Sequence, residues 1–461
     1  MLRTGATIRL GIVALGLAGP AAHANPASLV ASAADPDDPA DLHIRLDYEY
    51  SVETATIWRE RVGAAANPTD PIPTVLDLAF KQNRHLLTPR ADLGIYHNTS
   101  LTVALPIIIS QQRELTLGKG VTRDGSSTVL DGLLPLEGFD ARDPGTPLAG
   151  DLMFRDVSRS GLDQVHAGMT IALMNQDNDD TKPTWKIGGE LRAPVGRVMR
   201  FNATSPSSET GVGRGVYEAR AWMSVARRFR RTESWFELYW QTPVAEKDTS
   251  LLRLSDGEKF GATNFKAGQR GGAAFGLEVY AYDDRANGNR ISLDLGARID
   301  AHFEGRDYSE LWQVFAYAGD AESKPCNDPL VPSLVLDSDP TQMGCQARSH
   351  PGVTNVENYL EMAGRAAVRA QLGKYVRFAA MLDMVWKTDH IISFADAGID
   401  LPTCGAAGVS GPCENDANGV VNPGTAEVNP FHVPRIDLVG HRYHSEDNRG
   451  YVIGVQGQLL F

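Results

Sequence analysis

Apolar and polar residues alternate one by one along most of this chain. The clearest example, residues 41–50, places an apolar side chain at every second position: Leu42, Ile44, Leu46, Tyr48 and Tyr50. Residues 289–303 and 376–386 repeat the pattern. Because successive side chains of a β-strand point to opposite faces, the pattern predicts strands with one apolar and one polar face. Helical periodicity is confined to residues 74–80 and 309–318.

The alternating segments predict about twelve strands. We place them at residues 42–61, 85–97, 99–117, 162–175, 183–195, 215–231, 233–245, 269–283, 289–304, 356–371, 374–392 and 447–461. Many exceed the roughly five or six residues that are common in soluble sheets. They reach the ~9–11 residues that a tilted strand needs to cross a membrane.

Short and long connections alternate between these strands. The short ones are 97–100, 175–182, 231–233, 283–288 and 372–374, and the long ones are 62–84, 118–161, 196–214, 246–268, 305–355 and 393–446. This rhythm is typical of outer-membrane barrels, which have short periplasmic turns and long external loops. We therefore predict an all-β protein, a closed antiparallel transmembrane β-barrel over residues 42–461, with outer-membrane lipid around it. A soluble exported β-sandwich is the alternative.

The N-terminus predicts export. Arg3 and Arg9 precede a short apolar core at 10–18, and Ala22-His23-Ala24 fits a cleavage site, so residues 1–24 are expected to be a signal peptide, with an uncleaved anchor as the alternative. Residues 25–41 then form a periplasmic N-terminal linker. Elsewhere no apolar run approaches the ~20 residues of a spanning helix. The net charge of −13 excludes the basic field that nucleic acid requires.

The polar faces of the strands predict a charged lumen. The candidate lumen-lining residues are Arg45, Asp47, Glu49, Glu190, Arg192, Glu218, Arg220, Asp294, Arg298, Asp300, Glu361, Arg365, Arg369, Arg377 and Asp383. One interpretation is a polar constriction that selects a solute. The other is a network of ion pairs that fills the barrel, because a buried unpaired charge is costly. Twelve strands predict a small interior rather than a wide pore.

Four cysteines, Cys326, Cys345, Cys404 and Cys413, predict disulfides in an exported chain, and three pairings are possible. We favour Cys326–Cys345 and Cys404–Cys413, because each pair lies within one Pro/Gly/Asp-rich external loop. The spacings do not match a zinc site, and we expect no metal and no cofactor. His441 and His444 offer two ligands, but incidental loop histidines explain them as well. A hairpin turn explains the acidic run at 175–179 better than a calcium loop does.

Neither a Gly-x-Ser-x-Gly elbow nor a His-Glu-x-x-His motif is present, so we expect no enzyme; the alternative is an outer-membrane hydrolase whose Ser, His and acidic residues meet only in space. Aromatic residues near the predicted strand ends suggest girdles at the two membrane interfaces. They are Trp58, Trp185, Tyr217, Trp235, Tyr239, Trp386 and Tyr451. The chain ends on Phe461, which resembles the terminal aromatic signal that the barrel assembly machinery recognises in outer-membrane barrels.

Residues 91–106, 160–173 and 185–196 resemble a family of outer-membrane transporters, the phenol meta-cleavage-pathway outer-membrane proteins. That family is related in architecture to fatty-acid and hydrocarbon uptake channels. The resemblance implies a porin-like channel or transporter of a Gram-negative-type outer membrane for small molecules, hydrophobic or aromatic ones among them. The alternative is a non-transporting surface or structural protein that binds a partner through loops 305–355 and 393–446.

Overall fold

The computed structural model describes residues 28–35, 38–62, 71–252, 266–284, 286–326, 333–337, 343–400, 420–421, 427–429 and 431–461. The predicted signal peptide and the predicted Cys404–Cys413 pair lie outside the described residues. Among the described residues, no helix has both the length and the apolar character needed to cross a membrane.

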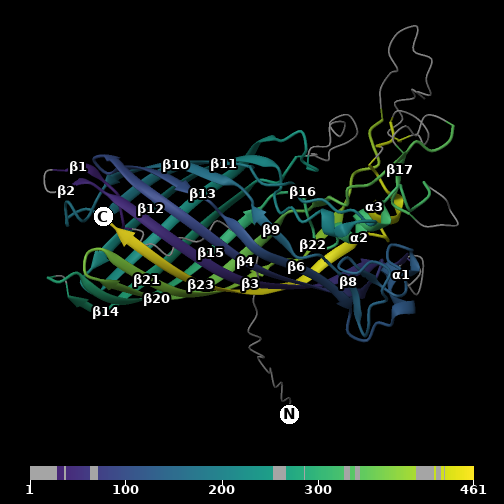
Figure 1. Cartoon of the computed structure of the whole chain (residues 1–461), viewed down its shortest axis with the longest axis horizontal. Coiled ribbons are helices and arrows are strands. Elements are labelled where there is room, and N and C mark those ends of the chain that lie inside the picture. Colours follow the sequence, from purple (N-terminus) through teal and green to yellow (C-terminus); the bar gives the residue numbers. More distant parts are fainter. Residues whose placement is uncertain are drawn as a thin grey trace, which may run out of the picture.

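Twelve antiparallel strands form a closed barrel (Figure 1), which confirms the predicted fold class. They are β3 Leu42–Glu60, β4 Thr74–Tyr96, β5 Thr99–Ala104 continued by β6 Ile107–Leu117, β10 Val165–Met174, β11 Thr184–Ala193, β12 Val216–Phe229, β13 Thr232–Glu246, β14 Arg270–Asp284, β15 Asn289–His302, β20 Tyr359–Leu372, β21 Val376–Lys387 and β23 Tyr443–Leu460. The last strand, β23, pairs with the first, β3, from Tyr443↔Arg59 to Leu460↔His43. This pairing removes the free edge of the sheet.

Two of the predicted elements differ from those in the structure. Residues 74–80, predicted as helical, are the first third of β4, where Phe80 lies between Ala55 of β3 and Leu115 of β6. Pairing with two neighbouring strands overrides a local periodicity that is only two turns long. The predicted strand 99–117 is interrupted between β5 and β6 at Pro106, which has no N–H for the ladder. The second helical prediction is confirmed by α2 Trp312–Ala318.

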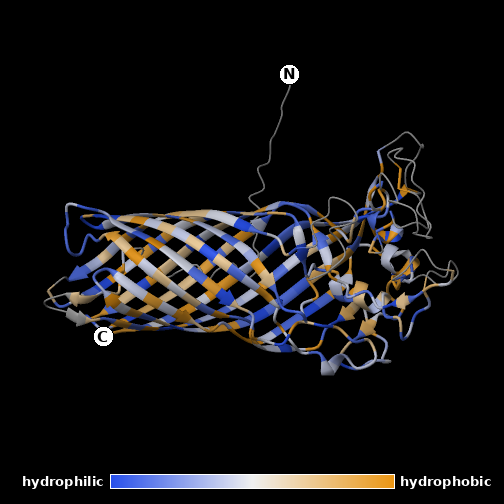
Figure 2. Ribbon diagram, turned by 90° about the horizontal axis from the view of Figure 1, so that it is seen from above, coloured by the Kyte–Doolittle hydropathy of each residue, from blue (hydrophilic) through white to orange (hydrophobic). Residues whose placement is uncertain are grey.

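The wall of the barrel is apolar on the outside and polar on the inside. Along β23, the side chains of Tyr451, Ile453 and Val455 are exposed, whereas those of Gln456 and Gln458 are buried. Figure 2 shows the same alternation of hydrophobic and hydrophilic positions along the other strands of the barrel. This is the reverse of a soluble protein and is the pattern expected for a sheet that is surrounded by lipid.

Two of the aromatic side chains predicted to lie in the girdles point the other way. Trp235 donates a hydrogen bond from Nε1 to Asp294 Oδ1 (2.9 Å), and the hydroxyl of Tyr239 donates to Asp300 Oδ1 (2.7 Å). Both aspartates are buried in the lumen. In β13 the outward aromatic residues are Phe236 and Trp240 instead. The prediction of a girdle position for Trp235 and Tyr239 was wrong, because nearness to a strand end does not fix the face on which a residue lies.

The long connections fold into a cap at the end of the barrel opposite the C-terminus (Figure 1). The short elements outside the twelve strands are β7 Phe139–Asp140, β8 Leu152–Arg155, β9 Arg159–Leu162, β16 Gly305–Asp307, β17 Leu336–Asp337, β18 Ala347–Arg348, β19 Thr354–Val356, β22 His390–Ser393, α1 Ser127–Leu130, α2 and α3 Pro434–Asp437. The largest apolar core of the described residues joins this cap to the ends of β3, β4, β6 and β23, and includes Phe154, Phe315, Phe394 and Tyr443. The described part of the cap is therefore packed onto the barrel.

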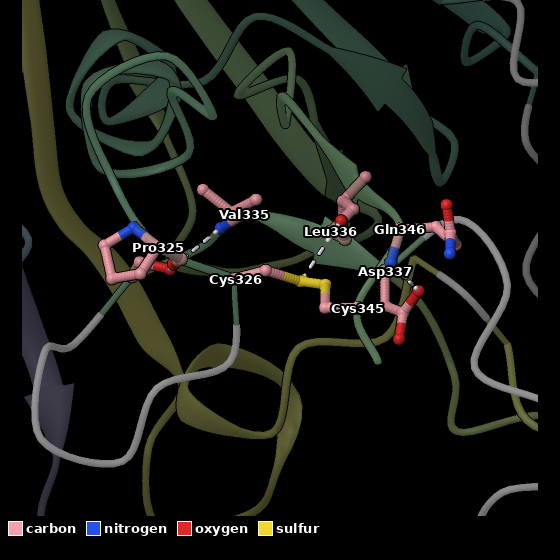
Figure 3. The surroundings of a disulfide bond; sticks show 8 residues. Pro325, Cys326, Val335, Leu336, Asp337, Cys345 and Gln346 are labelled. Carbon is pink, nitrogen blue, oxygen red and sulfur yellow. Dashed lines mark hydrogen bonds between the residues drawn. A yellow bond between two sulfur atoms is a disulfide. The ribbon is translucent and has the colours of Figure 1, made fainter. Parts of the chain in front are cut away.

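A disulfide joins Cys326 and Cys345, with a Cα–Cα distance of 6.0 Å (Figure 3). These are the two cysteines of the first predicted pair. Beside the bridge, β17 and β18 form a two-stranded ribbon, and the backbone N–H of Gln346 donates to Asp337 Oδ1 (3.0 Å). The bridge thus holds together a segment of the cap in which regular backbone pairing is short.

Replacing Phe461 by aspartate should lower the level of folded protein in the outer membrane several-fold. The Phe461 side chain is exposed on the outer surface, and its backbone bonds Leu42 in both directions (3.0 Å each) at the closing seam. A carboxylate there would face the lipid interface, where the direct cost is only about 0–1 kcal/mol. A large loss on heat-modifiable gels would therefore reflect assembly. Lys374→Asp, in the exposed turn at the same end, is the control, and equal levels of the two variants would contradict a special role for Phe461.

Replacing Cys326 and Cys345 together by serine should expose the external segment between β16 and β19 to added protease, because the bridge constrains a loop whose closure is worth about 3 kcal/mol. The heat-modifiable migration of the barrel should not change, since both cysteines lie outside the twelve barrel strands. The double variant Cys404→Ser/Cys413→Ser serves for comparison. Cleavage at the same rate in the wild type and the Cys326/Cys345 variant would refute the prediction.

Candidate functional site

The structure places the predicted lumen residues on the inner face, and none of them is exposed. Arg45, Asp47, Arg192, Glu218, Arg220, Asp294, Asp300, Glu361, Arg369 and Asp383 are buried, and Glu49, Glu190, Arg298, Arg365 and Arg377 are half-buried. Their positions follow from the alternation of the strands. Most of them fall into two sets that share Glu361: one set forms an ion-pair network, and the other lines a cavity.

One set forms ion pairs between β14, β15, β20 and β21. Arg369 bridges two carboxylates, with Nη1 at 2.9 Å from Glu278 Oε2 and Nη2 at 2.8 Å from Asp294 Oδ2. Arg298 pairs with Asp300 at 2.6 Å. These pairs favour the structural interpretation, in which opposite charges fill one side of the lumen and fix the strands to one another.

Two further contacts extend this network. Arg298 also pairs with Glu361, and Arg365 of β20 pairs with Asp383 of β21. A cavity of about 20 Å³ lies beside Arg369 and Arg377, whereas Glu361 and Lys387, farther along β20 and β21, border a larger cavity. The part of the lumen around Arg369 is thus largely filled by its own charges.

The other set of predicted residues lines a larger cavity of about 230 Å³ in the lumen. These residues are Arg45, Glu190, Arg192, Glu218, Arg220 and Glu361. Cationic side chains on its wall outnumber carboxylates by nine to six: Arg45, Arg84, Arg90, Arg113, Arg192, Arg214, Arg220, Arg270 and Lys387 against Asp163, Glu190, Glu218, Asp307, Glu310 and Glu361. Four of these cations are paired with carboxylates that lie just outside the lining: Arg45 with Asp47 (2.8 Å), Arg90 with Asp92 (2.7 Å), Arg220 with Glu237 (3.0 Å) and Lys387 with Glu53 (2.6 Å). The positive charge that is not matched by contact therefore belongs to particular residues and not to the whole wall.

Sequence reasoning missed the wall made by β4 and β6. Arg84 fell in the connection predicted at 62–84, and Arg113 was not listed although its strand was predicted. Extending the alternation of β4 back from Thr88 through Leu86 would have found Arg84. In the structure Arg84 lies opposite Gln111, and Gln82 lies opposite Arg113.

Apolar side chains continue this wall. Leu86, Ile108 and Val212 form a small buried cluster and also line the cavity. Arg113 donates to Gln82 Oε1 (2.7 Å) and to the backbone oxygen of Ser309 (3.2 Å). The wall therefore changes from amide and guanidinium groups to hydrocarbon within a few residues.

Three aromatic rings stack along another part of the cavity wall. The ring of Tyr359 lies 4.3 Å from that of His302 and 4.8 Å from that of His390, measured between centroids. Beside them, Glu310 comes from the connection after β16. Burial disfavours its charged form, but His390 and Lys387 outweigh that effect and lower the pKa of Glu310 below its ordinary value. Glu310 is therefore ionised at neutral pH.

Both ends of the lumen are narrowed by segments outside the spanning strands. At the external end, the hydroxyl of Tyr308 donates to Met199 O (2.8 Å), which holds residues 308–310 against the cavity. At the other end, the described part of the N-terminal segment is bonded to the barrel. Lys186 Nζ donates to Leu29 O (3.1 Å), and Asn98 N donates to Ser32 Oγ (2.9 Å). The short strands β1 Ala33–Asp35 and β2 Asp38–Ala40 lie here as well.

Within the described residues, no group of three or more His, Cys, Asp or Glu side chains is arranged to hold a metal ion. His444 Nε2 lies 3.2 Å from Glu60 Oε1. The acidic run after β10 makes turn hydrogen bonds, in which Asp177 N donates to Asn175 Oδ1 and Thr181 N donates to Asp179 Oδ1, each at 3.0 Å.

No protein-family model and no curated protein matches the chain. Among solved structures, the chain is similar to the COG4313 outer membrane channel of Pseudomonas putida F1, with 9% identity, 91% of this chain and 95% of that chain covered and a TM-score of 0.36. It is also similar to a FadL homologue of Pseudomonas aeruginosa (10% identity, 91% and 90% covered, TM-score 0.32). A third is a mutant of the TodX monoaromatic hydrocarbon channel (8% identity, 91% and 90% covered, TM-score 0.28). We base the function on the residues of this chain.

Replacing Arg369 by methionine should lower the free energy of unfolding in detergent by about 3–5 kcal/mol, because it leaves Glu278 and Asp294 buried without their cation. Denaturant titration of the purified barrel measures the change. The matched control is Arg377→Met on the neighbouring strand. Arg377 donates to the neutral Gln371 Oε1 (3.0 Å), so its loss should cost only about 0.5–1.5 kcal/mol. Equal losses of stability in the two variants would count against a structural role for the ion pairs.

Proposed function

We propose that this protein is an outer-membrane channel or transporter for small molecules. The observation that carries the proposal is a cavity of about 230 Å³ inside a closed barrel whose outer wall is apolar. A strand needs about 9–11 residues to cross a bilayer, and the twelve strands reach that length. A barrel of this kind satisfies its backbone within lipid, and the bacterial outer membrane is where such barrels reside.

The cavity limits the size of the solute. Pockets for drug-sized ligands hold about 300–1,000 Å³, so a volume of about 230 Å³ suits a smaller molecule. The patch of Leu86, Ile108 and Val212 and the rings stacked on Tyr359 give it surfaces for an apolar or aromatic body. We propose that the charges of the filled side maintain the barrel and that the charges around the larger cavity select the solute.

One feature favours the alternative of a non-transporting surface protein. The cap has a buried apolar core, and residues 308–310 reach from it to the cavity, so the external end is not an open pore. Under this alternative the cap would bind a partner and the lumen would pass nothing. The two functions differ in one measurable property, which is solute flux.

Purified protein in liposomes should let small uncharged solutes in faster than protein-free liposomes do, measured by swelling or by single-channel conductance. A variant without residues 25–41 should pass them several-fold faster, because this removes the segment that Lys186 and Asn98 hold at the periplasmic end. Lys186→Met should have a smaller effect in the same direction, since it loses one of those bonds.

An empty-liposome preparation and heat-denatured protein are the controls. No flux in either the full barrel or the shortened variant would overturn the transport proposal and leave the surface-protein alternative. Flux in both at the same rate would keep transport but show that the N-terminal segment is no obstacle.

A further inference from the structure

We propose that the wall formed by β4 and β6 binds a compact organic anion, with its acidic group at Arg84 and Arg113 and its apolar body on Leu86, Ile108 and Val212. This inference rests on the proposed transport function, because it names the class of solute that the lumen takes. Two observations support it. Arg84 and Arg113 are buried, with no carboxylate of the described residues in contact, and an apolar cluster lies next to them.

Arg84 is a buried cation whose side chain has no ion-pair or hydrogen-bond partner among the described residues. Its side chain is only 9% exposed, and its Nε has no hydrogen bond. No carboxylate oxygen in the described part of the chain lies within 4.0 Å of its guanidinium nitrogens. The charges that act on it from farther away are those of Asp163, Glu49 and Glu53. A buried guanidinium in this state is costly, and an anion placed in the cavity would supply the missing partner.

Arg113 adds a second uncompensated charge next to it. The side chain is buried, and its hydrogen bonds go to the neutral oxygens of Gln82 and Ser309. Gln82 in turn donates to Glu53 Oε2 (3.2 Å), and the charge of that carboxylate is already matched by Lys387 at 2.6 Å. The positive charge of Arg113 is therefore not cancelled by contact.

The register places both guanidiniums on one face. Because Arg84 is opposite Gln111 and Gln82 is opposite Arg113, the two arginines are diagonal neighbours, with side chains about 7–8 Å apart at their base. Two guanidinium groups at this spacing can both reach a single carboxylate, which they bind with paired N–H donors. Gln111, which also lines the cavity, offers a neutral donor between them.

The apolar cluster decides what kind of anion fits. Leu86 follows Arg84 on the same face of β4, and Ile108 lies on β6 beside it. A small inorganic anion at the arginines would make no contact with the apolar side chains of this cluster. A molecule with a carboxylate at one end and a small apolar or aromatic ring at the other covers both surfaces. Benzoate is such a probe, and benzamide and benzylamine are its neutral and cationic counterparts of similar shape.

The test measures two properties of the full protein: flux of the three probes into liposomes, and equilibrium binding of benzoate to the detergent-solubilised barrel by calorimetry. The wild type should pass benzoate faster than benzamide and benzylamine and should bind benzoate. Arg84→Met should lower both the benzoate-to-benzamide flux ratio and the affinity for benzoate about tenfold, the loss expected for one charged hydrogen-bonded contact. The Arg84 side chain makes no hydrogen bond within the described residues, so this variant should fold. Heat-modifiable migration checks that it does.

Arg377→Met is the matched control, because it removes the same charge from the lumen outside the larger cavity. Its flux ratio should stay within about twofold of the wild type, since field strength falls with distance and screening. Equal flux of benzoate and benzamide, or an unchanged ratio and affinity in Arg84→Met, would refute the anion site while leaving transport intact. Equal losses of the flux ratio in Arg84→Met and Arg377→Met would show that the positive charge of the whole lumen, and not a site at Arg84, favours benzoate. Benzoate binding without any flux would keep the site and overturn transport.

Discussion

The structure depends on the closure of one hydrogen-bond ladder. In lipid an unpaired backbone N–H or C=O costs several kcal/mol, so a sheet can be surrounded by hydrocarbon only if it has no edge. The pairing of β23 with β3 meets this condition, and at its end Phe461 and Leu42 bond each other through both backbone groups. The even strand number follows from that antiparallel closure, and so does the position of Leu42 and Phe461 at the same end of the barrel.

Closure also determines where each kind of side chain goes. A closed sheet with apolar residues outside must place its polar residues in the lumen, and charges there need partners. Around Arg369 the partners are opposite charges, and the space left beside them is small. At the wall of β4 and β6, Arg84 and Arg113 have no carboxylate of the described residues within ion-pair distance, and here the larger cavity remains. Among the described residues, the largest apolar core lies where the cap packs against the inner faces of β3, β4, β6 and β23 near their external ends.

The sequence was sufficient for the fold because alternation and loop length are local properties. Twelve strands, their short turns and the outward face of β23 could all be predicted from them. The first third of β4 could not, because its seven residues also fit two turns of helix and only the neighbouring strands decide. Trp235 and Tyr239 were assigned to the wrong face because a shift of one residue reverses every side chain of a strand. The alternation predicted which face the candidate lumen residues occupy. Their ion pairs depend on the register between neighbouring strands, and the sequence of one strand does not specify that register.

Arg84 shows what register adds to composition. The alternation along β4 predicts only that the polar side chain of Arg84 faces the lumen. The neighbour opposite it on β6 is Gln111, and no carboxylate oxygen in the described parts of the chain lies within 4.0 Å of its guanidinium nitrogens. A guanidinium in the same barrel, Arg369, is held by two carboxylates. Because a buried charge without a partner destabilises the protein that carries it, a network meant only to fill the barrel would pair both. The difference between these two arginines is therefore the strongest physical reason to separate a structural side of the lumen from a side that recognises a solute.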